Sequence, residues 1–284
     1  MSLGSSARVF NFGPGNPDPG VFPAADLAAA APLGIYARDR AKLASAIATW
    51  RGASRHFVVR LSPAEVQAKV AARLTAMPAE ERDYWTALVA RTGADRDSLT
   101  FLALSLDAGG SPIGVANTDP ATRLFLGDVA APGGDALRTS ADDRADALRD
   151  VRLFVRSYPV GLLIDEVGPV VANDAYASPA VWNAFVHDPY HGPRVVWGRE
   201  INLFLLGAAN RLNAAADTAY ASELRNAIRA VRSAVQASGF HSELWSYDVT
   251  GGRVVPARYG TSADVQLWST TDLAVEYTLS RLPR

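Results

Sequence analysis

The sequence contains no cysteine in its 284 residues. This absence excludes disulfide bonds, thiolate nucleophiles and cysteine-bound zinc. It does not indicate a compartment, because a chain without cysteine tolerates both reducing and oxidising surroundings. We therefore leave the localisation open, with a cytoplasmic protein favoured over one whose signal peptide has been removed.

The sequence also lacks an excess of charge of one sign and any long apolar run. The formal net charge is −1, and arginine, aspartate and glutamate are interspersed along the chain. A surface for nucleic acid needs clustered positive charge, so we expect no nucleic-acid partner. No apolar stretch approaches the roughly 18 to 20 residues that span a bilayer, so we expect a soluble protein without a membrane partner. The oligomeric state stays open.

Two frequent signatures of catalytic sites are absent as well. The sequence has no Gly-x-Ser-x-Gly nucleophile elbow and no glycine-rich phosphate loop before a helix. We expect neither a cofactor nor a resident metal ion.

Recognisable signals for helix starts are present from residue 61 onward. Ser62 and Glu65 form a potential capping box around Pro63, which suits a first helical position. Ser140 and Ser178 precede two later helical patterns in the same way. By contrast, proline and glycine are dense near the N-terminus, so we expect residues 1–60 to be a loop-rich lead-in with one short helix.

Apolar spacing in the second half predicts paired helices. Periodic apolar residues over 201–212 and 220–235 predict an αα-hairpin, and Gly251-Gly252 predicts a β-hairpin near 243–259. A closing helix follows. We therefore expect a mainly α domain of stacked αα-hairpins over residues 61–284, with one small β-hairpin.

Aromatic and polar residues gather in the last third of the chain. Trp197, Trp245 and Trp268 each stand near charged or amide side chains, among them Arg199 and Glu200. An aromatic ring can cover the apolar face of a sugar while polar side chains bind its hydroxyls, so this mixture favours a carbohydrate ligand. The alternative is that these tryptophans belong to the core and that their indole N–H groups are hydrogen-bonded there.

Four blocks carry a resemblance to a known superfamily. They are "FLALSLDAGGSPIGVANTDPATRLFLG", "SYPVGLLIDEVGPVVANDAYA", "DPYHGPRVVWGREINLFLLGAANRL" and "SELWSYDVTGGRVVPARYGTSADVQLWST", and they occur in this order over roughly residues 99 to 284. Together they resemble the (α/α)6-toroid glycosidases, such as glycogen-debranching glucosidases and processing α-glucosidases. In those proteins the first block lies at the end of a helix and leads into a leucine-rich helix. A complete toroid needs a longer chain, so we expect an incomplete ring or hairpins missing at the N-terminus.

The resemblance implies an inverting glycoside hydrolase that acts on glucosyl or related oligosaccharides. It places the general base on Glu243, which opens the last block. An inverting enzyme also needs a general acid. The upstream acid motif of the superfamily is absent from residues 1–98, so Asp39 is only a positional candidate. The expected substrate-binding residues are Asp188, Tyr190, His191, Trp197, Arg199, Glu200 and Trp245.

Two other interpretations remain open. A non-catalytic carbohydrate-binding or structural module would keep the helical scaffold without the acid. A metal-dependent hydrolase could use His187, Asp188, His191 and Glu200, although Pro189 disfavours the helix on which His-x-x-x-His spacing places two ligands. Turn positions are the favoured interpretation for Asp119 and for the Asp165-Glu166 pair.

Overall fold

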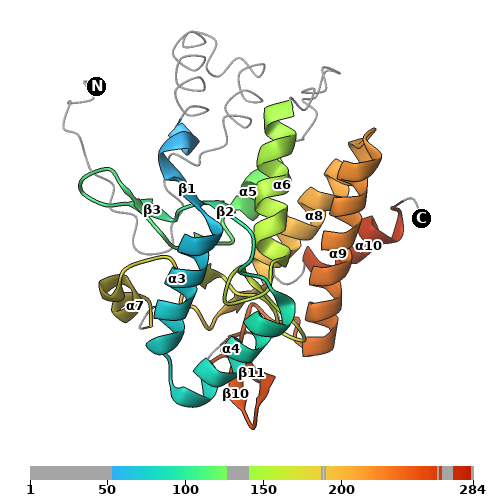
Figure 1. The fold of residues 1–284 in the computed structure, drawn as a ribbon. Coiled ribbons are helices and arrows are strands. Elements are labelled where there is room, and N and C mark those ends of the chain that lie inside the picture. The colour runs from blue at the N-terminus through green and yellow to red at the C-terminus, as the bar shows by residue number, and fades with distance from the viewer. Residues whose placement is uncertain are drawn as a thin grey trace, which may run out of the picture.

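The computed structural model describes residues 53–126, 141–186, 188, 190–260, 262–263 and 271–282. Asp39, His187 and Trp268 lie outside these residues, as does most of the expected lead-in over residues 1–60. About half of the described residues are helical, and the strands among them form small antiparallel sheets (Figure 1). The expected mainly α class is confirmed.

The first helical pair forms where the sequence predicts it. Helices α3 (Pro63–Thr75) and α4 (Ala79–Thr92) are joined by a short turn. The Ser62 N–H donates to the Glu65 carboxylate at 2.8 Å, and the Glu65 N–H donates back to the Ser62 hydroxyl at 3.4 Å. Gly93 ends α4 at a φ of 61°, which a residue with a side chain rarely adopts.

The segment that the resemblance places at the end of a helix forms strands instead. After the 3-10 turn η4 (Ser54–Phe57), strand β1 (Val58–Leu61) pairs with β2 (Leu99–Leu102), and β3 (Ser105–Leu106) pairs with β4 (Pro112–Ile113). In β2 the side chains of Leu99 and Phe101 are buried, and those of the residues after each are partly exposed. This period of two is the strand pattern, and β1 supplies the pairing partner that stabilises it.

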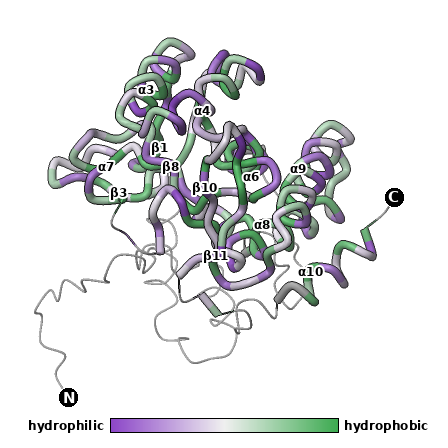
Figure 2. The backbone as a smooth tube through the Cα atoms, turned by 90° about the horizontal axis from the view of Figure 1, so that it is seen from below, coloured by the Kyte–Doolittle hydropathy of each residue, from purple (hydrophilic) through white to green (hydrophobic). Residues whose placement is uncertain are grey.

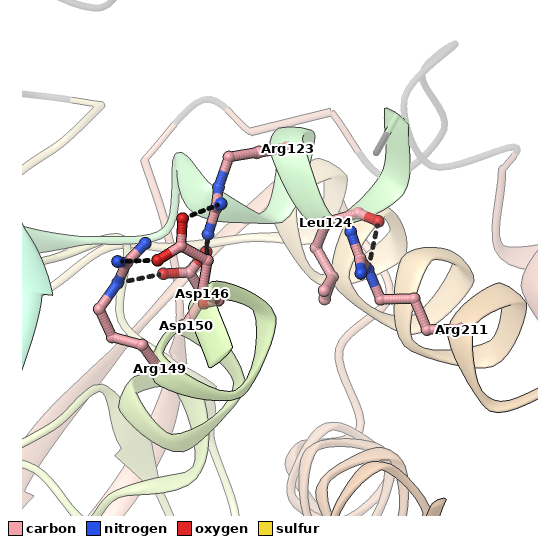
Figure 3. Close-up of polar contacts among 6 residues, drawn as sticks. All are labelled: Arg123, Leu124, Asp146, Arg149, Asp150 and Arg211. Carbon is pink, nitrogen blue, oxygen red and sulfur yellow. Dashed lines mark hydrogen bonds and ion pairs between the residues drawn. The ribbon is translucent and has the colours of Figure 1, made fainter. Parts of the chain in front are cut away.

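Ion pairs tie the short helix α5 (Pro120–Leu126) to α6 (Ala141–Val155) (Figure 3). Arg123 of α5 contacts Asp146 and Asp150 of α6. Arg149 holds the same two carboxylates at 2.6 and 3.1 Å. Asp150 is only 2% exposed, so both of its arginine partners offset the cost of burying its charge. The network fixes the position of α5.

Three long helices form one side of the molecule. Helices α6, α8 (Gly198–Ala214) and α9 (Thr218–Ser238) lie side by side, and α10 (Thr271–Ser280) packs against α8 (Figure 1). Phe154 of α6 stacks on Phe204 of α8 at a ring-centroid distance of 4.3 Å. The expected αα-hairpin is therefore present as α8 and α9.

The remaining strands form two local hairpins and two pairs between segments that are distant in sequence. The expected β-hairpin consists of β10 (Leu244–Thr250) and β11 (Arg253–Arg258), and β9 (Val196–Trp197) pairs with the other edge of β10. Two further pairs are β5 (Ala116–Asn117) with β8 (Ala172–Asn173), and β6 (Leu163–Ile164) with β7 (Gly168–Pro169). Helix α7 (Pro179–Phe185) follows β8 and begins after Ser178, as predicted.

One main hydrophobic core connects these elements. It runs from Leu61 of β1 to Leu279 of α10 and includes the fully buried Trp85, Phe204 and Trp245. Hydrophilic and hydrophobic residues alternate along α9 (Figure 2). The hydrophobic residues form one buried face of the helix, which includes Leu224, Ile228 and Val231. Among the helices of the described residues, we find none with the length and apolarity that crossing a bilayer requires.

Candidate functional site

The start of α8 and the start of β10 come together at one place. Leu244 is paired with Trp197, and the Gly198 N–H donates to the Glu243 carbonyl at 2.9 Å. A Cβ atom at Gly198 would lie 2.8 Å from the Ser242 carbonyl oxygen, so this approach requires glycine. Glu243, which lies more than 40 positions away in the sequence, is thereby placed beside the Trp197–Glu200 segment.

Trp197 is at the centre of a group of polar and aromatic side chains. His191 meets its ring edge-on at a centroid distance of 5.5 Å, and the Arg199 guanidinium lies 5.6 Å from its centroid. Such cation–π contact orients the arginine. Trp197 is half-buried and packs against a small second apolar cluster that contains Leu244 and Tyr259. The aromatic ring is thus held in place while part of it stays accessible.

A tight turn positions His191 next to Trp197. The Asp188 carboxylate accepts the backbone N–H groups of Tyr190 and His191, each at 2.8 Å, and its oxygen lies 3.3 Å from the His191 Nδ1. Tyr190 is 49% exposed. Burial raises the pKa of the Tyr259 hydroxyl, and the charges of Asp188 and Tyr190 add to this effect, so Tyr259 also lies at this site. The predicted residues Asp188, Tyr190 and His191 are therefore brought together with Trp197.

Glu200 is a buried carboxyl group at the beginning of α8. Its side chain is 2% exposed and bonds to Arg199. Burial raises the pKa of Glu200 to about 8, the charge of Asp119 acts in the same direction, and Arg199 opposes both. Glu200 is therefore mostly protonated at pH 7, unlike an exposed glutamate.

Asp119 reaches the same place because α5 packs closely on α8. A Cβ atom at Gly207 would lie 2.7 Å from backbone atoms of Leu124 and Phe125, so glycine lets the two helix backbones touch. The Arg211 guanidinium of α8 also donates to the Leu124 carbonyl at 3.5 Å (Figure 3). Asp119 immediately precedes α5, and its charge interacts with His191, Arg199 and Glu200.

The side chain of Asp119 is exposed to water even though the surrounding protein limits its solvation. This limited solvation raises the pKa of Asp119, while His191 and Arg199 lower it. The sequence offered one signal for this residue, Asn-Thr-Asp-Pro, and that pattern is equally typical of a turn.

Within the described part of the chain, three polar atoms in this group are buried without a hydrogen-bond partner: His191 Nε2, Trp197 Nε1 and Glu200 Oε2. Buried polar atoms are paired in most folded proteins, and an orphan atom often marks a place where water or a ligand binds. His191 and Arg199 thus bring polar groups to the edge and face of the Trp197 ring, and the charge of Asp119 acts on both. That combination suits a neutral ligand with many hydroxyl groups.

A cleft of about 260 Å³ adjoins this group on the other side of Gly198 and Ser242. Its apolar lining includes Ile201 and Phe240, and its polar lining includes Gln236 and the Arg232–Glu276 ion pair. The cleft is large enough for one small ring with an apolar face and several polar substituents.

Trp245 is a core residue that also lines the cleft of about 260 Å³, so its predicted role in substrate binding stays a prediction. Its side chain is 1% exposed, and its indole N–H donates to the Val167 carbonyl at 2.8 Å. This is the core position that the sequence left open as the alternative. Asp165 and Glu166 lie in the turn between β6 and β7, as expected, and Glu166 has a positive φ of 65°.

The metal-site alternative finds no support in the part of the chain that the structure describes. No group of three or more histidine, aspartate or glutamate side chains there could hold a metal ion. His187 is outside that part, and the described members Asp188, His191 and Glu200 do not form such a group by themselves.

Comparisons with known proteins add no relative. No family model, no curated protein and no solved structure matches the chain. The functional assignment therefore rests on the geometry of the site and on the motifs of the sequence.

Proposed function

We propose that the chain is a glycoside hydrolase-like protein that acts on glucosyl or related oligosaccharides by inversion, with Glu243 as the general base. Its αα-hairpins would then be part of an (α/α)6 toroid. The observation that supports this proposal is the 2.9 Å hydrogen bond from the Gly198 N–H to the Glu243 carbonyl, which joins the main chain of Glu243 to the start of α8.

Each residue has a role that fits its surroundings. The Trp197 ring covers the apolar face of a pyranose, and the Arg199 guanidinium and the His191 ring bind hydroxyl groups at its edge. Glu200 is buried beneath the site, and its bond to Arg199 holds the guanidinium in position to bind the sugar. Glu243 takes a proton from the attacking water.

The test is a comparison of wild-type protein with Glu243→Gln on maltotriose, isomaltotriose and nigerose, with released glucose as the readout. Loss of a general base lowers the rate by roughly 100- to 10,000-fold. The control is Glu223→Gln, because Glu223 forms a surface ion pair with Arg152, and such pairs contribute little to stability. Turnover of Glu243→Gln at the wild-type rate would contradict the role of Glu243.

A second candidate is a carbohydrate-binding module without catalysis. The half-buried indole of Trp197, whose N–H has no hydrogen-bond partner among the described residues, favours it. This protein would bind the same oligosaccharides without releasing glucose. Calorimetric titration with maltotriose distinguishes the two candidates. Binding that Trp197→Ala abolishes, with no turnover by the wild type, would establish the module and exclude the hydrolase.

A further inference from the structure

We infer, on the basis of the proposed hydrolytic function, that Asp119 is the general acid of this site. No residue of the first 98 positions carries the acid motif of the resembled superfamily, and Asp39 lies outside the described residues. The acid would then come from the start of α5, which packs on α8.

The turn at Asp119 does not need the Asp119 carboxylate. The Asp119 N–H donates to the Asn117 Oδ1 at 3.0 Å, and the Thr122 N–H donates to the Asp119 backbone carbonyl at 3.0 Å. Asn117 therefore holds the turn, and the first turn of α5 uses the Asp119 main chain. Among the described residues, the Asp119 carboxyl group forms no direct hydrogen bond or ion pair, and its charge acts on His191 and Arg199 through space, so this group is available to a ligand.

Accessibility distinguishes Asp119 from its neighbour Glu200. A general acid must come within hydrogen-bonding distance of the leaving oxygen, so the accessibility of a candidate residue is considered before its pKa. Glu200 is 2% exposed, whereas water reaches Asp119. The surrounding protein also raises the pKa of Asp119, which is the direction that a proton donor requires.

The packing that positions Asp119 is specific. Gly207 allows backbone contact between α5 and α8, and the Arg123–Asp150 ion pair anchors α5 to α6. The charge of Asp119 therefore acts on Glu200, which follows the Trp197–Arg199 segment directly. Asp119 and Glu243 are in this way both associated with the start of α8, although 124 positions separate them in the sequence.

The proposed step is balanced in protons and bonds. The Asp119 carboxylic acid gives its proton to the glycosidic oxygen as the C1–O bond breaks, and the bonding electron pair stays on that oxygen. The oxygen of a water molecule bonds to C1 from the opposite face and loses a proton to the Glu243 carboxylate. Asp119 then takes up a proton from solvent, and Glu243 releases one.

The experiment compares two substrates that need the acid to different extents. Maltose has a poor leaving group, which must be protonated, whereas the fluoride of α-glucosyl fluoride leaves without full proton transfer. We expect Asp119→Asn to lower kcat/KM for maltose by about 100-fold or more and to change it for α-glucosyl fluoride by less than about 10-fold. Glu243→Gln should lower both. The control is Asp83→Asn, an exposed aspartate on α4.

The outcomes separate this inference from the proposed function. An active wild type with the selective loss in Asp119→Asn supports the inference. An active wild type with an equal loss on both substrates, or no loss, overturns the role of Asp119 and leaves the hydrolase intact. A wild type that hydrolyses neither substrate overturns the hydrolase and the general acid together. Circular dichroism of Asp119→Asn verifies that the variant is folded.

Discussion

Glu200 combines a titratable group with almost complete burial. Its pKa is about 8 in the folded protein and 4.5 when unperturbed. At a pH between these two pKa values, the carboxyl group therefore takes up a proton when the protein folds. The folded state then binds more protons than the unfolded state, and stability falls as pH rises through this window. We expect a loss of up to about 1.4 kcal/mol per pH unit from this group.

Urea unfolding of wild-type protein and of Glu200→Gln from pH 5 to pH 8 measures this contribution. The free energy of unfolding should decline more steeply with pH in the wild type, because glutamine does not titrate. Parallel curves would show that Glu200 ionises in the folded protein as an exposed glutamate does.

Two tryptophans from the same region of the sequence should respond in opposite ways. Trp245 is buried and hydrogen-bonded to Val167, so Trp245→Ala should cost about 3 to 5 kcal/mol. Trp197 is half-buried, so Trp197→Ala should cost less and should abolish sugar binding instead. Denaturant unfolding together with calorimetric titration with maltotriose gives both quantities. Equal destabilisation by the two changes, with sugar binding kept in Trp197→Ala, would make both residues purely structural.

At the scale of the element, the contact between α5 and α8 depends on Gly207. Alanine favours a helix over glycine by about 1 kcal/mol. At this position, however, its Cβ would lie 2.7 Å from backbone atoms of α5, and overpacking costs about 1 to 3 kcal/mol. We expect Gly207→Ala to destabilise the protein and to displace Asp119.

The control for this prediction is Ser222→Ala on the exposed side of α9, where alanine meets no neighbouring backbone. Thermal unfolding should show a lower midpoint for Gly207→Ala and an unchanged or higher midpoint for Ser222→Ala. A rise in both midpoints would mean that α5 moves away from α8 at little cost.

Local signals in the sequence predict most helices, but they do not predict which elements pack or pair with one another. The capping box at Ser62 and the apolar periodicity of α8 and α9 act within a few residues, and these helices form as predicted. Strand β2 could not be predicted in this way, because its partner β1 is distant in the sequence. Asp119 was interpreted from the sequence as a turn residue for the same reason, since the role that we propose for it depends on the packing of α5 against α8.

The candidate site was predictable in composition and less so in geometry. Residues 188–200 are consecutive, so a sequence motif already groups Asp188, His191 and Trp197. Whether a tryptophan faces a ligand or the core depends on strand pairing. Trp245 follows Leu244 on β10, and its side chain is buried against β7 and α9.

At the scale of the whole molecule, the main hydrophobic core connects most elements of the described residues, so we expect them to unfold as one cooperative unit. This core connects β1 near residue 61 with α10 near residue 279 and contains both Trp85 and Trp245. We therefore expect tryptophan fluorescence and far-ultraviolet circular dichroism to report the same denaturant midpoint. Two separated transitions would show that the helices α3 and α4 unfold independently of α8 and α9.

The central claim is that Trp197, Arg199 and Glu200 form, with Glu243, a site for inverting hydrolysis of a glucosyl linkage. The most direct measurement is proton NMR of the anomeric region while the wild type hydrolyses maltotriose, with Glu243→Gln beside it. Inversion of an α-linkage yields the β-anomer first. We predict that β-anomer appears before mutarotation in the wild type and is absent with Glu243→Gln. Initial formation of the α-anomer, or product formation at the same rate by Glu243→Gln, would contradict the account.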